Sequence, residues 1–347
     1  MSNTTHSNVQ EYYGTTLSGS DDLKTNACCT DESMSAEHKE ILKKIAPEIL
    51  DKYYGCGIPL PTALEGLNVL DLGSGTGRDV YLISKLVGES GHVTGIDMTD
   101  QQLDVARKYQ SFQAEAFGYK TSNVSFKKGY IEDLTSCGIK DKSMDLVVSN
   151  CVINLSPDKA AVYKEIIRVL KPGGELYFSD VFSSSRVPEH LTKDPVLHGE
   201  CLSGAMYIED FRRLLAQCGV NDCRVMSKRR LTIENKEIEE KLDGIDFYSI
   251  TVRGFKLELE DRCEDFGQTA RYLGNDKENK DKFILDNNHT FHSRKPKLVC
   301  GNTADMLSKT RFKTYFEIVG NQSSHFGSFD CEENCPEKSP QKSTGCC

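Results

Sequence analysis

The sequence has no long hydrophobic run and no recognisable leader segment. No stretch of the chain approaches the ~18 consecutive apolar residues that a membrane-spanning helix needs. The first residues, MSNTTHSNVQEYYG, lack the basic and apolar regions of a signal peptide. We therefore expect a cytoplasmic protein with no membrane association.

An excess of positive charge is missing as well. Asp and Glu (52) outnumber Lys and Arg (43), which gives a formal net charge of -9. Nucleic-acid backbones and anionic membranes attract proteins that carry a positive footprint. This charge balance therefore argues against both as main partners and favours a small-molecule substrate. We expect a monomer.

The sequence shows no internal repeat, and its composition is that of a folded chain. Hydrophobic residues make up 38% and charged residues 27%, enough for a core under a solvated surface. Helical and strand patterns alternate from residue 36 to residue 233, which predicts an α/β domain with a mostly parallel, Rossmann-like sheet. The segments around this domain are predicted to be an N-terminal segment (1–35), a smaller C-terminal α+β domain (234–320) and a flexible tail (321–347).

Within the α/β domain the expected elements follow one another closely. We predict strands at 68–73, 91–97, 123–129, 144–150 and 175–181, helices at 78–87, 99–117 and 158–171, and two more elements near 207–218 and 224–233. The helix at 99–117 is predicted to open with a capping box formed by Thr99 and Gln102.

A glycine-rich loop follows the first predicted strand. In Asp71-Leu-Gly73-Ser-Gly75-Thr-Gly77 the glycines let the backbone approach a ligand where the strand turns into a helix. Asp97 ends the next strand, 20 residues after Gly77 (97 − 77 = 20), where its carboxylate can accept hydrogen bonds from both hydroxyls of a ribose. The loop departs from the dinucleotide fingerprint because its third glycine comes one residue early.

The form D-L-G-S-G-T-G-R-D resembles the first motif of class I S-adenosylmethionine-dependent methyltransferases. Four later segments match that family in order, namely Asp97, Gly129-Tyr-Ile-Glu-Asp133, Asn150 and Leu170-Lys-Pro-Gly-Gly174. The resemblance implies that S-adenosylmethionine is bound by Asp71, Gly73, Gly75, Gly77, Asp97, Met98, Ile131, Glu132 and Asn150, with Ile131 and Glu132 beside the adenine.

The 14 cysteines are the most unusual feature of the composition. In a reducing compartment we expect them to be thiols rather than a disulfide framework, and the alternative to a chemical role is that most are small buried side chains. Cys151 directly follows the fourth predicted strand, at the edge where open α/β sheets bind ligands. Cys56 precedes the first strand in a glycine-flanked loop, and Cys201 follows the fifth strand. We predict that these three thiols converge beside the methyl group of the cofactor.

These cysteines carry a closer resemblance, to the arsenite methyltransferases. It covers about residues 10–320, including Tyr53-Tyr-Gly-Cys-Gly57, Ser149-Asn-Cys-Val-Ile-Asn154, Gly174-Glu-Leu-Tyr-Phe-Ser-Asp180 and Gly199-Glu-Cys201. It implies methylation of arsenite to mono- and dimethylated arsenicals in arsenic detoxification, with thiol adducts of arsenite and monomethylarsenite as substrates and As(III) bound at Cys56, Cys151 and Cys201. A fourth family cysteine falls on Cys28, and Cys29 beside it leaves that assignment open.

Soft As(III) pairs with soft thiolates, and methyl transfer formally oxidises the arsenic. Two cysteines can return the two electrons by forming a disulfide, which thioredoxin or glutathione must then reduce. We assign Cys28 as the resolving thiol and Cys56 as its partner. Cys151 and Cys201 are then the pair that holds arsenic through later methylations.

Three other interpretations remain open. The first is a zinc site, for which the pairs Cys218/Cys223 and Cys331/Cys335 approach the usual spacing but lack a second pair of ligands. The second is a methyltransferase of the same fold that acts on a carbon or oxygen nucleophile, such as a quinone or a phospholipid base. The third is a metalloid-binding protein without catalytic activity.

Overall fold

The computed structural model describes residues 6, 9–10, 34–53, 55, 57, 59–192, 194, 197, 201–233, 235–242 and 244–330. The chain divides into two compact units, Met1–Glu258 and Leu259–Cys347. Across the described residues, we find no helix with the length and apolar character needed to cross a membrane.

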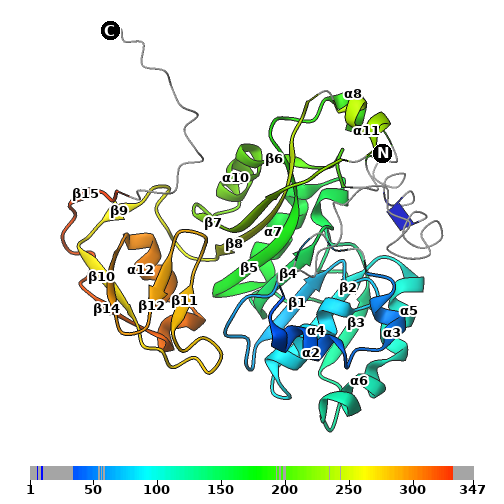
Figure 1. The fold of residues 1–347 in the computed structure, drawn as a ribbon, viewed down its shortest axis with the longest axis horizontal. Helices are drawn as coiled ribbons and strands as arrows, with labels where there is room; N and C mark the ends of the chain where they lie inside the picture. The colour runs from blue at the N-terminus through cyan, green and yellow to red at the C-terminus, as the bar shows by residue number, and fades with distance from the viewer. Residues whose placement is uncertain are drawn as a thin grey trace. The chain divides into compact units, whose positions relative to one another are not determined.

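A mixed sheet forms the centre of the first unit (Figure 1). The described residues give it eight strands, in the order β3-β2-β1-β4-β5-β8-β7, with β6 paired to β5. Strands β1 to β5 pair with one another in parallel, whereas β8 is antiparallel to both of its neighbours, β5 and β7. The strands are β1 (Asn68–Leu72), β2 (His92–Asp97), β3 (Val124–Lys128), β4 (Met144–Asn150), β5 (Leu170–Ser183), β6 (Met206–Tyr207), β7 (Cys223–Arg230) and β8 (Phe247–Phe255). The predicted Rossmann-like α/β fold is confirmed.

Helices cover both faces of this sheet because successive strand residues point to opposite sides. In β4, Val147 packs into the core of one face, whereas Leu146 and Val148 pack into the core of the other. The Val147 side is covered by α7 (Lys159–Val169) and α10 (Ile208–Gln217). The other side is covered by α2 (Ala36–Leu42), α3 (Pro47–Leu50), α4 (Arg78–Val87), α5 (Asp100–Lys108) and α6 (Gln110–Phe117). The shorter elements of the unit are η3 (Ile153–Leu155), α8 (Glu189–Thr192) and α11 (Lys236–Lys241).

The long helix predicted over 99–117 is in fact two helices. The chain leaves the helical conformation at Tyr109, which ends α5 and precedes α6. Thr99 occupies the N-cap position, but its side chain makes no capping hydrogen bond.

The boundary predicted between residues 233 and 234 is also wrong. The apolar segment 247–255 is β8, and it pairs along its whole length with β5. Its side chains belong to the first core, which moves the boundary to Glu258.

The described residues of the second unit, up to residue 330, form three small sheets, one α-helix and one 3-10 helix. Its elements are β9 (Glu264–Asp265), β10 (Gln268–Tyr272), β11 (Lys282–Ile284), β12 (Thr290–His292), β13 (Pro296–Val299), α12 (Gly301–Ser308), η4 (Arg311–Thr314), β14 (Phe316–Val319) and β15 (Gly327–Ser328). Aromatic rings fill its core, with the ring of Phe283 lying 4.9 Å from Phe312 and 5.0 Å from Phe316. Strand β15 lies within the predicted tail, of which residues 331–347 are outside the described part of the chain.

A buried ion pair joins β5 to β8. Arg253 donates from Nε to Glu175 Oε1 over 2.6 Å, and the two side chains are 1% and 0% exposed. The guanidinium also lies over the ring of Tyr177, 5.3 Å from its centre. Because both charges are removed from water, each depends on the other for its stability.

We predict that Arg253→Met lowers the free energy of unfolding by about 3–5 kcal/mol, because it leaves the Glu175 carboxylate buried without its cation. Arg186→Met is the matched control, since its ion pair with Asp210 is exposed and should contribute no more than about 1 kcal/mol. Urea denaturation of the two variants measures the difference. Equal losses would contradict a structural role for the buried pair.

Candidate functional site

A pocket opens at the carboxyl ends of β1, β2 and β4. It is lined by His6, Val9, Lys52, Tyr53, Gly55, Asp71, Gly73, Ser74, Gly75, Thr76, Arg78, Asp79, Asp97, Met98, Thr99, Gln102, Gly129, Tyr130, Ile131, Glu132, Asn150, Cys151, Val152, Leu155 and Ser156. Every residue that the sequence predicted to bind cofactor lies on this wall except Gly77, and Cys151 lies there with them. The carboxyl edge of an open parallel sheet is where such folds bind ligands.

The glycine loop between β1 and α4 shapes one side of the pocket. Gly73 has a φ of 71°, and the amides of Gly73 and Ser74 both donate to the carbonyl of Ile96 at the end of β2. A side chain at Gly73 would meet Val152 at 2.4 Å. The loop therefore needs glycine here, both for its left-handed backbone and for its close approach to the segment after β4.

Gly77 has a structural role at the start of α4. It is the N-cap residue of α4, with a φ of 90°, and it does not line the pocket. A Cβ atom at Gly77 would lie 2.8 Å from the ring of Phe126 on β3. Gly77 thus allows the helix to pack closely on the sheet.

The carboxylate of Asp97 is held by the backbone. Oδ2 accepts a hydrogen bond from Gly75 N (2.9 Å) and Oδ1 accepts one from Thr99 N (2.8 Å). Burial raises the pKa of Asp97, and these hydrogen bonds act in the opposite direction. Asp97 lines the pocket, where its carboxylate can act as a hydrogen-bond acceptor for a ligand.

The pocket concentrates negative charge. Asp71 is buried behind the glycine loop, and its pKa is raised well above the usual value by burial and by the nearby charges of Asp79 and Asp97. A ligand with net positive charge would relieve this repulsion. The hydroxyl of Ser74 is buried in the same wall and has no hydrogen-bond partner among the described residues. These features fit a cationic ligand that carries further polar groups.

The segment predicted to contact adenine lies on the opposite wall. Glu132 accepts a hydrogen bond from Ser156 Oγ (2.5 Å) and pairs with His6 Nε2 (3.2 Å). The ring of His6 stacks on Tyr130 at 4.4 Å between centres. The motifs gave no indication of His6 or Ser156, because both lie outside the segments that match the family.

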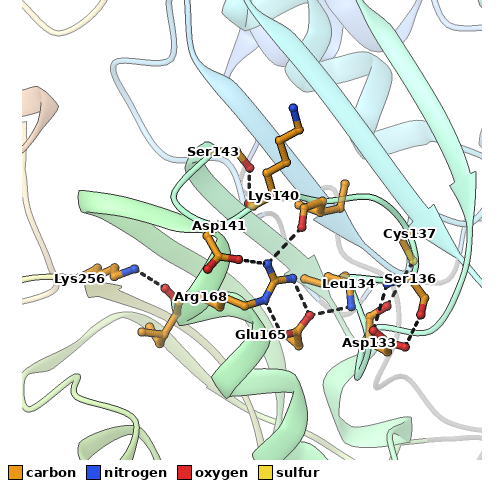
Figure 2. A network of polar contacts seen from close by, with 12 residues as sticks. Asp133, Leu134, Ser136, Cys137, Lys140, Asp141, Ser143, Glu165, Arg168 and Lys256 are labelled. Carbon is orange, nitrogen blue, oxygen red and sulfur yellow. Dashed lines mark hydrogen bonds and ion pairs between the residues drawn. The ribbon is translucent and has the colours of Figure 1, made fainter.

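Helix α7 fixes the chain directly after Glu132 (Figure 2). Leu134 N donates to Glu165 Oε2 (2.8 Å), and Arg168 binds the same carboxylate (2.7 Å) together with Asp141 (2.5 Å). Arg168 holds the pKa of Glu165 below its usual value. The anchored backbone at Leu134 is two residues from the pocket wall, so this network stabilises the adenine side of the site.

Asn150 connects the end of β4 to the loop that precedes β1. Its Oδ1 accepts from Gly57 N (3.1 Å), while Nδ2 lies 2.6 Å from Tyr53 Oη and 2.9 Å from Gly57 O. The guanidinium of Arg78 lies 3.8 Å above the Tyr53 ring and bonds to Asp79 (3.1 Å). The side chain of Asn150 therefore holds the loop over the pocket, a contact that sequence spacing does not reveal.

Two of the four predicted catalytic cysteines lie side by side. Cys151 has a φ of 56° and Cys201 a φ of 60°, which places both in the left-handed region that non-glycine residues seldom occupy. Cys201 Sγ contacts the carbonyl oxygen of Cys151 at 3.5 Å, and the two residues are 0% and 3% exposed, respectively. Cys201 lies behind the pocket wall, against Cys151. Cys28, Cys29 and Cys56 are outside the described residues.

The oxidation states of the cysteines differ in part from the expectation. Cys137, Cys201, Cys218, Cys223, Cys263 and Cys300 are free cysteines. Cys151, in contrast, is disulfide-bonded. In the described part of the chain, no group of three or more His, Cys, Asp or Glu side chains has the arrangement of a metal site. Cys218 and Cys223 therefore belong to no such group.

Buried polar residues surround the two cysteines. Burial raises the pKa of Asp180 to about 7, against hydrogen bonds from Val181 and Asn154 that lower it. Lys159, at the start of α7, has its pKa lowered by burial and raised by the charges of Asp180, Cys201 and Glu132. Oppositely charged groups thus lie close to the cysteines although the surroundings are otherwise apolar.

Comparison with known proteins places these features in a family. A family model described as a methyltransferase domain matches residues 63–219. An arsenite methyltransferase from Aquipseudomonas alcaligenes is 48% identical over 99% of this chain and 100% of its own length. The human arsenite methyltransferase is 45% identical over 89% of this chain and 82% of its own length. The crystal structure of an arsenic(III) S-adenosylmethionine methyltransferase from Chlamydomonas reinhardtii aligns with a TM-score of 0.83 at 45% identity, covering 86% of this chain and 100% of that one.

Fold and pocket therefore define a class I methyltransferase that uses S-adenosylmethionine as methyl donor. Within that class, the chain belongs to the arsenite methyltransferase family. The pocket fits the donor, since the acidic residues suit a positively charged sulfonium and ammonium, and the Asp97 carboxylate can receive the ribose hydroxyls.

We predict that Asp97→Ala weakens the binding of S-adenosylhomocysteine by about 10- to 150-fold, because it removes a charged acceptor worth about 1.5–3 kcal/mol. Isothermal titration calorimetry measures this directly. Asp104→Ala is the control, because Asp104 is an exposed acidic residue on α5 that pairs only loosely with Arg107, at 3.7 Å. Unchanged affinity in Asp97→Ala would contradict the assignment of the ribose site.

Proposed function

We propose that this protein transfers methyl groups from S-adenosylmethionine to thiolate-bound trivalent arsenic, converting arsenite to mono- and dimethylated arsenicals. The observation that carries the proposal is the contact between Cys201 Sγ and the Cys151 carbonyl at the wall of the pocket. Two sulfur-bearing residues thus come together where the donor methyl is expected. The names of the relatives and the family motifs support the same substrate.

Binding of the donor is the task of the residues on the sheet edge. When bound, S-adenosylmethionine supplies an electrophilic methyl group on a positively charged sulfur. Asp97 accepts from the ribose, the glycine loop lets the backbone approach, and Glu132 and Ile131 border the adenine. The acidic environment around Asp71 favours the positively charged end of the donor on the loop side of the pocket.

Cys151 and Cys201 bind the arsenic. Thiolates suit this soft ion, and the complex that As(III) forms with three of them is neutral. A neutral complex can occupy the apolar surroundings of Cys201, where a free thiolate would cost several kcal/mol. Its lone pair then faces the methyl carbon, and holding the reactants in place can provide about 7–11 kcal/mol of the barrier reduction.

Each methylation removes two electrons from arsenic, and a pair of thiolates returns them by forming a disulfide. We assign this step to Cys28 and Cys56, with arsenic also held by Cys56 in the first round. The disulfide at Cys151 supports thiol exchange that extends to the arsenic ligands themselves. Thioredoxin or glutathione then restores the thiols, which places the enzyme in a reducing compartment such as the cytoplasm, where it would serve arsenic detoxification.

The first test of this function is the release of S-adenosylhomocysteine with and without arsenite. We expect release to depend on arsenite and to be abolished in Cys151→Ser and in Cys201→Ser, for arsenite and monomethylarsenite alike, because a hard hydroxyl cannot replace a soft thiolate. Cys218→Ser serves as the control, because Cys218 lies at the end of α10 and is a partly buried residue packed against the core. Turnover without arsenite would favour a carbon or oxygen nucleophile, and arsenite binding without turnover would favour a metalloid-binding protein.

A second test separates arsenic ligands from redox thiols. Monomethylated arsenic has two positions left for sulfur, so its methylation needs only two protein thiolates. Cys56→Ser, or Cys28→Ser combined with Cys29→Ser, should therefore block methylation of arsenite and spare that of monomethylarsenite when excess glutathione supplies the electrons. Rates on the two substrates measure the effect, and equal loss on both would refute the division of roles.

A further inference from the structure

A buried polar pair lies between the two turns that carry Cys151 and Cys201. Asn154, three residues after Cys151, is 3% exposed, and Asp180 on β5 is 1% exposed. Their neighbours Cys151, Leu155, Val181, Cys201 and Leu202 form an apolar cluster. Polar groups in such surroundings are costly unless every hydrogen bond is made, so the geometry of the pair is tightly constrained.

The hydrogen bonds of this pair define the path of the Cys151 turn. Asn154 Nδ2 donates to Asp180 Oδ1 (2.7 Å) and to Val181 O (2.5 Å), and Asn154 N donates to Asp180 Oδ2 (3.2 Å). Asp180 Oδ1 also accepts from Val181 N (2.8 Å). Both the side chain and the backbone of Asn154 are thereby fixed to β5, next to the strand that Cys151 follows.

The same residue also determines how closely the Cys201 turn can approach. Gly204 lies against Asn154 so tightly that an added Cβ would come within 2.2 Å of the Asn154 carbonyl oxygen. Three residues earlier, Cys201 Sγ contacts the Cys151 carbonyl. Asn154 belongs to the Cys151 turn and contacts the Cys201 turn through Gly204. It therefore sets the separation between the two turns.

Both cysteines need such support because of their backbone conformation. A non-glycine residue at positive φ is strained and persists only where its surroundings fix it. Cys151 and Cys201 are two of the five such residues in the described part of the chain. Without the Asn154 contacts, either turn could relax and move its sulfur away from the other.

We propose that Asn154 and Asp180 are positioning residues for arsenic, which hold the turns of Cys151 and Cys201 at the separation that lets both sulfurs bind one As(III). This inference rests on the proposed function, because it takes the two cysteines as arsenic ligands. Neither residue touches the arsenic. Their effect is transmitted through the backbone of the two turns.

The test compares Asn154→Ala with Asn123→Ala in protein reduced with a phosphine. Asn123 is the matched control, because it is a buried asparagine of the same unit, 7% exposed. It lies directly before β3 and donates to Ser84 O (3.1 Å) and Gly88 O (2.8 Å), not to the turns of the two cysteines. We expect Asn154→Ala to weaken arsenite binding in equilibrium dialysis by about 10- to 100-fold, the range typical of residues that orient metal ligands. Binding of S-adenosylhomocysteine should stay within about twofold of wild type, and Asn123→Ala should leave both affinities unchanged even where it lowers thermal stability.

Asp180→Asn is the second variant, and it preserves shape should Asn154→Ala fail to fold. Its amide keeps the acceptor for Asn154 Nδ2 but loses the acceptor for Asn154 N, so we expect a smaller loss of arsenite affinity and a raised KM for arsenite at unchanged KM for the donor. Arsenic X-ray absorption should show fewer sulfur neighbours in the variants than in wild type. Wild-type arsenite affinity and sulfur coordination in either folded variant would overturn the inference while leaving the proposed function intact. A wild-type protein that does not bind arsenite would overturn both.

Discussion

The parallel pairing of β1 with β4 is the interaction on which the site depends. In that register Leu72 lies opposite Ser149, so the glycine loop and the cysteine turn leave the sheet at the same edge. The two segments then touch where Val152 fills the space that a side chain at Gly73 would occupy. This close contact makes the donor pocket adjacent to the proposed arsenic site. The covering helices on both faces bury the pairing and so fix the distance.

Two electrostatic environments meet at that contact. On the loop side, burial and the nearby charges of Asp79 and Asp97 raise the pKa of Asp71, and this group of carboxyls favours a cation. On the cysteine side, Cys151 and Cys201 belong to an apolar cluster. These opposite surroundings suit a sulfonium donor on one side and the proposed neutral thiolate complex of arsenic on the other. The boundary between them runs along β4, where Asn150 precedes Cys151.

Local pattern was sufficient to predict the sheet from β1 to β5 and most of the pocket wall, because buried strands and glycine turns leave periodic signals in the sequence. It failed where tertiary contacts decide the outcome. The apolar pattern of β8 would be the same whether the strand paired with β5 or belonged to another unit. Only its pairing with β5 assigns it to the first unit. The roles of Asn154 and Tyr53 arise from partners 26 and 97 residues away in sequence, which spacing cannot reveal. Gly77 matched a binding motif but serves helix packing, since both roles need the same residue type.

The disulfide at Cys151 sets an order on the chemistry of the proposed site. A sulfur engaged in a disulfide cannot bind arsenic, so reduction must come before substrate binding. The Cys201 thiol already lies against Cys151, and the hydrogen bonds of Asn154 and Asp180 do not involve the disulfide. The two turns can therefore keep their separation while the sulfur of Cys151 changes partner. In the proposed cycle, the supply of reductant would then determine when the pair of ligands becomes available.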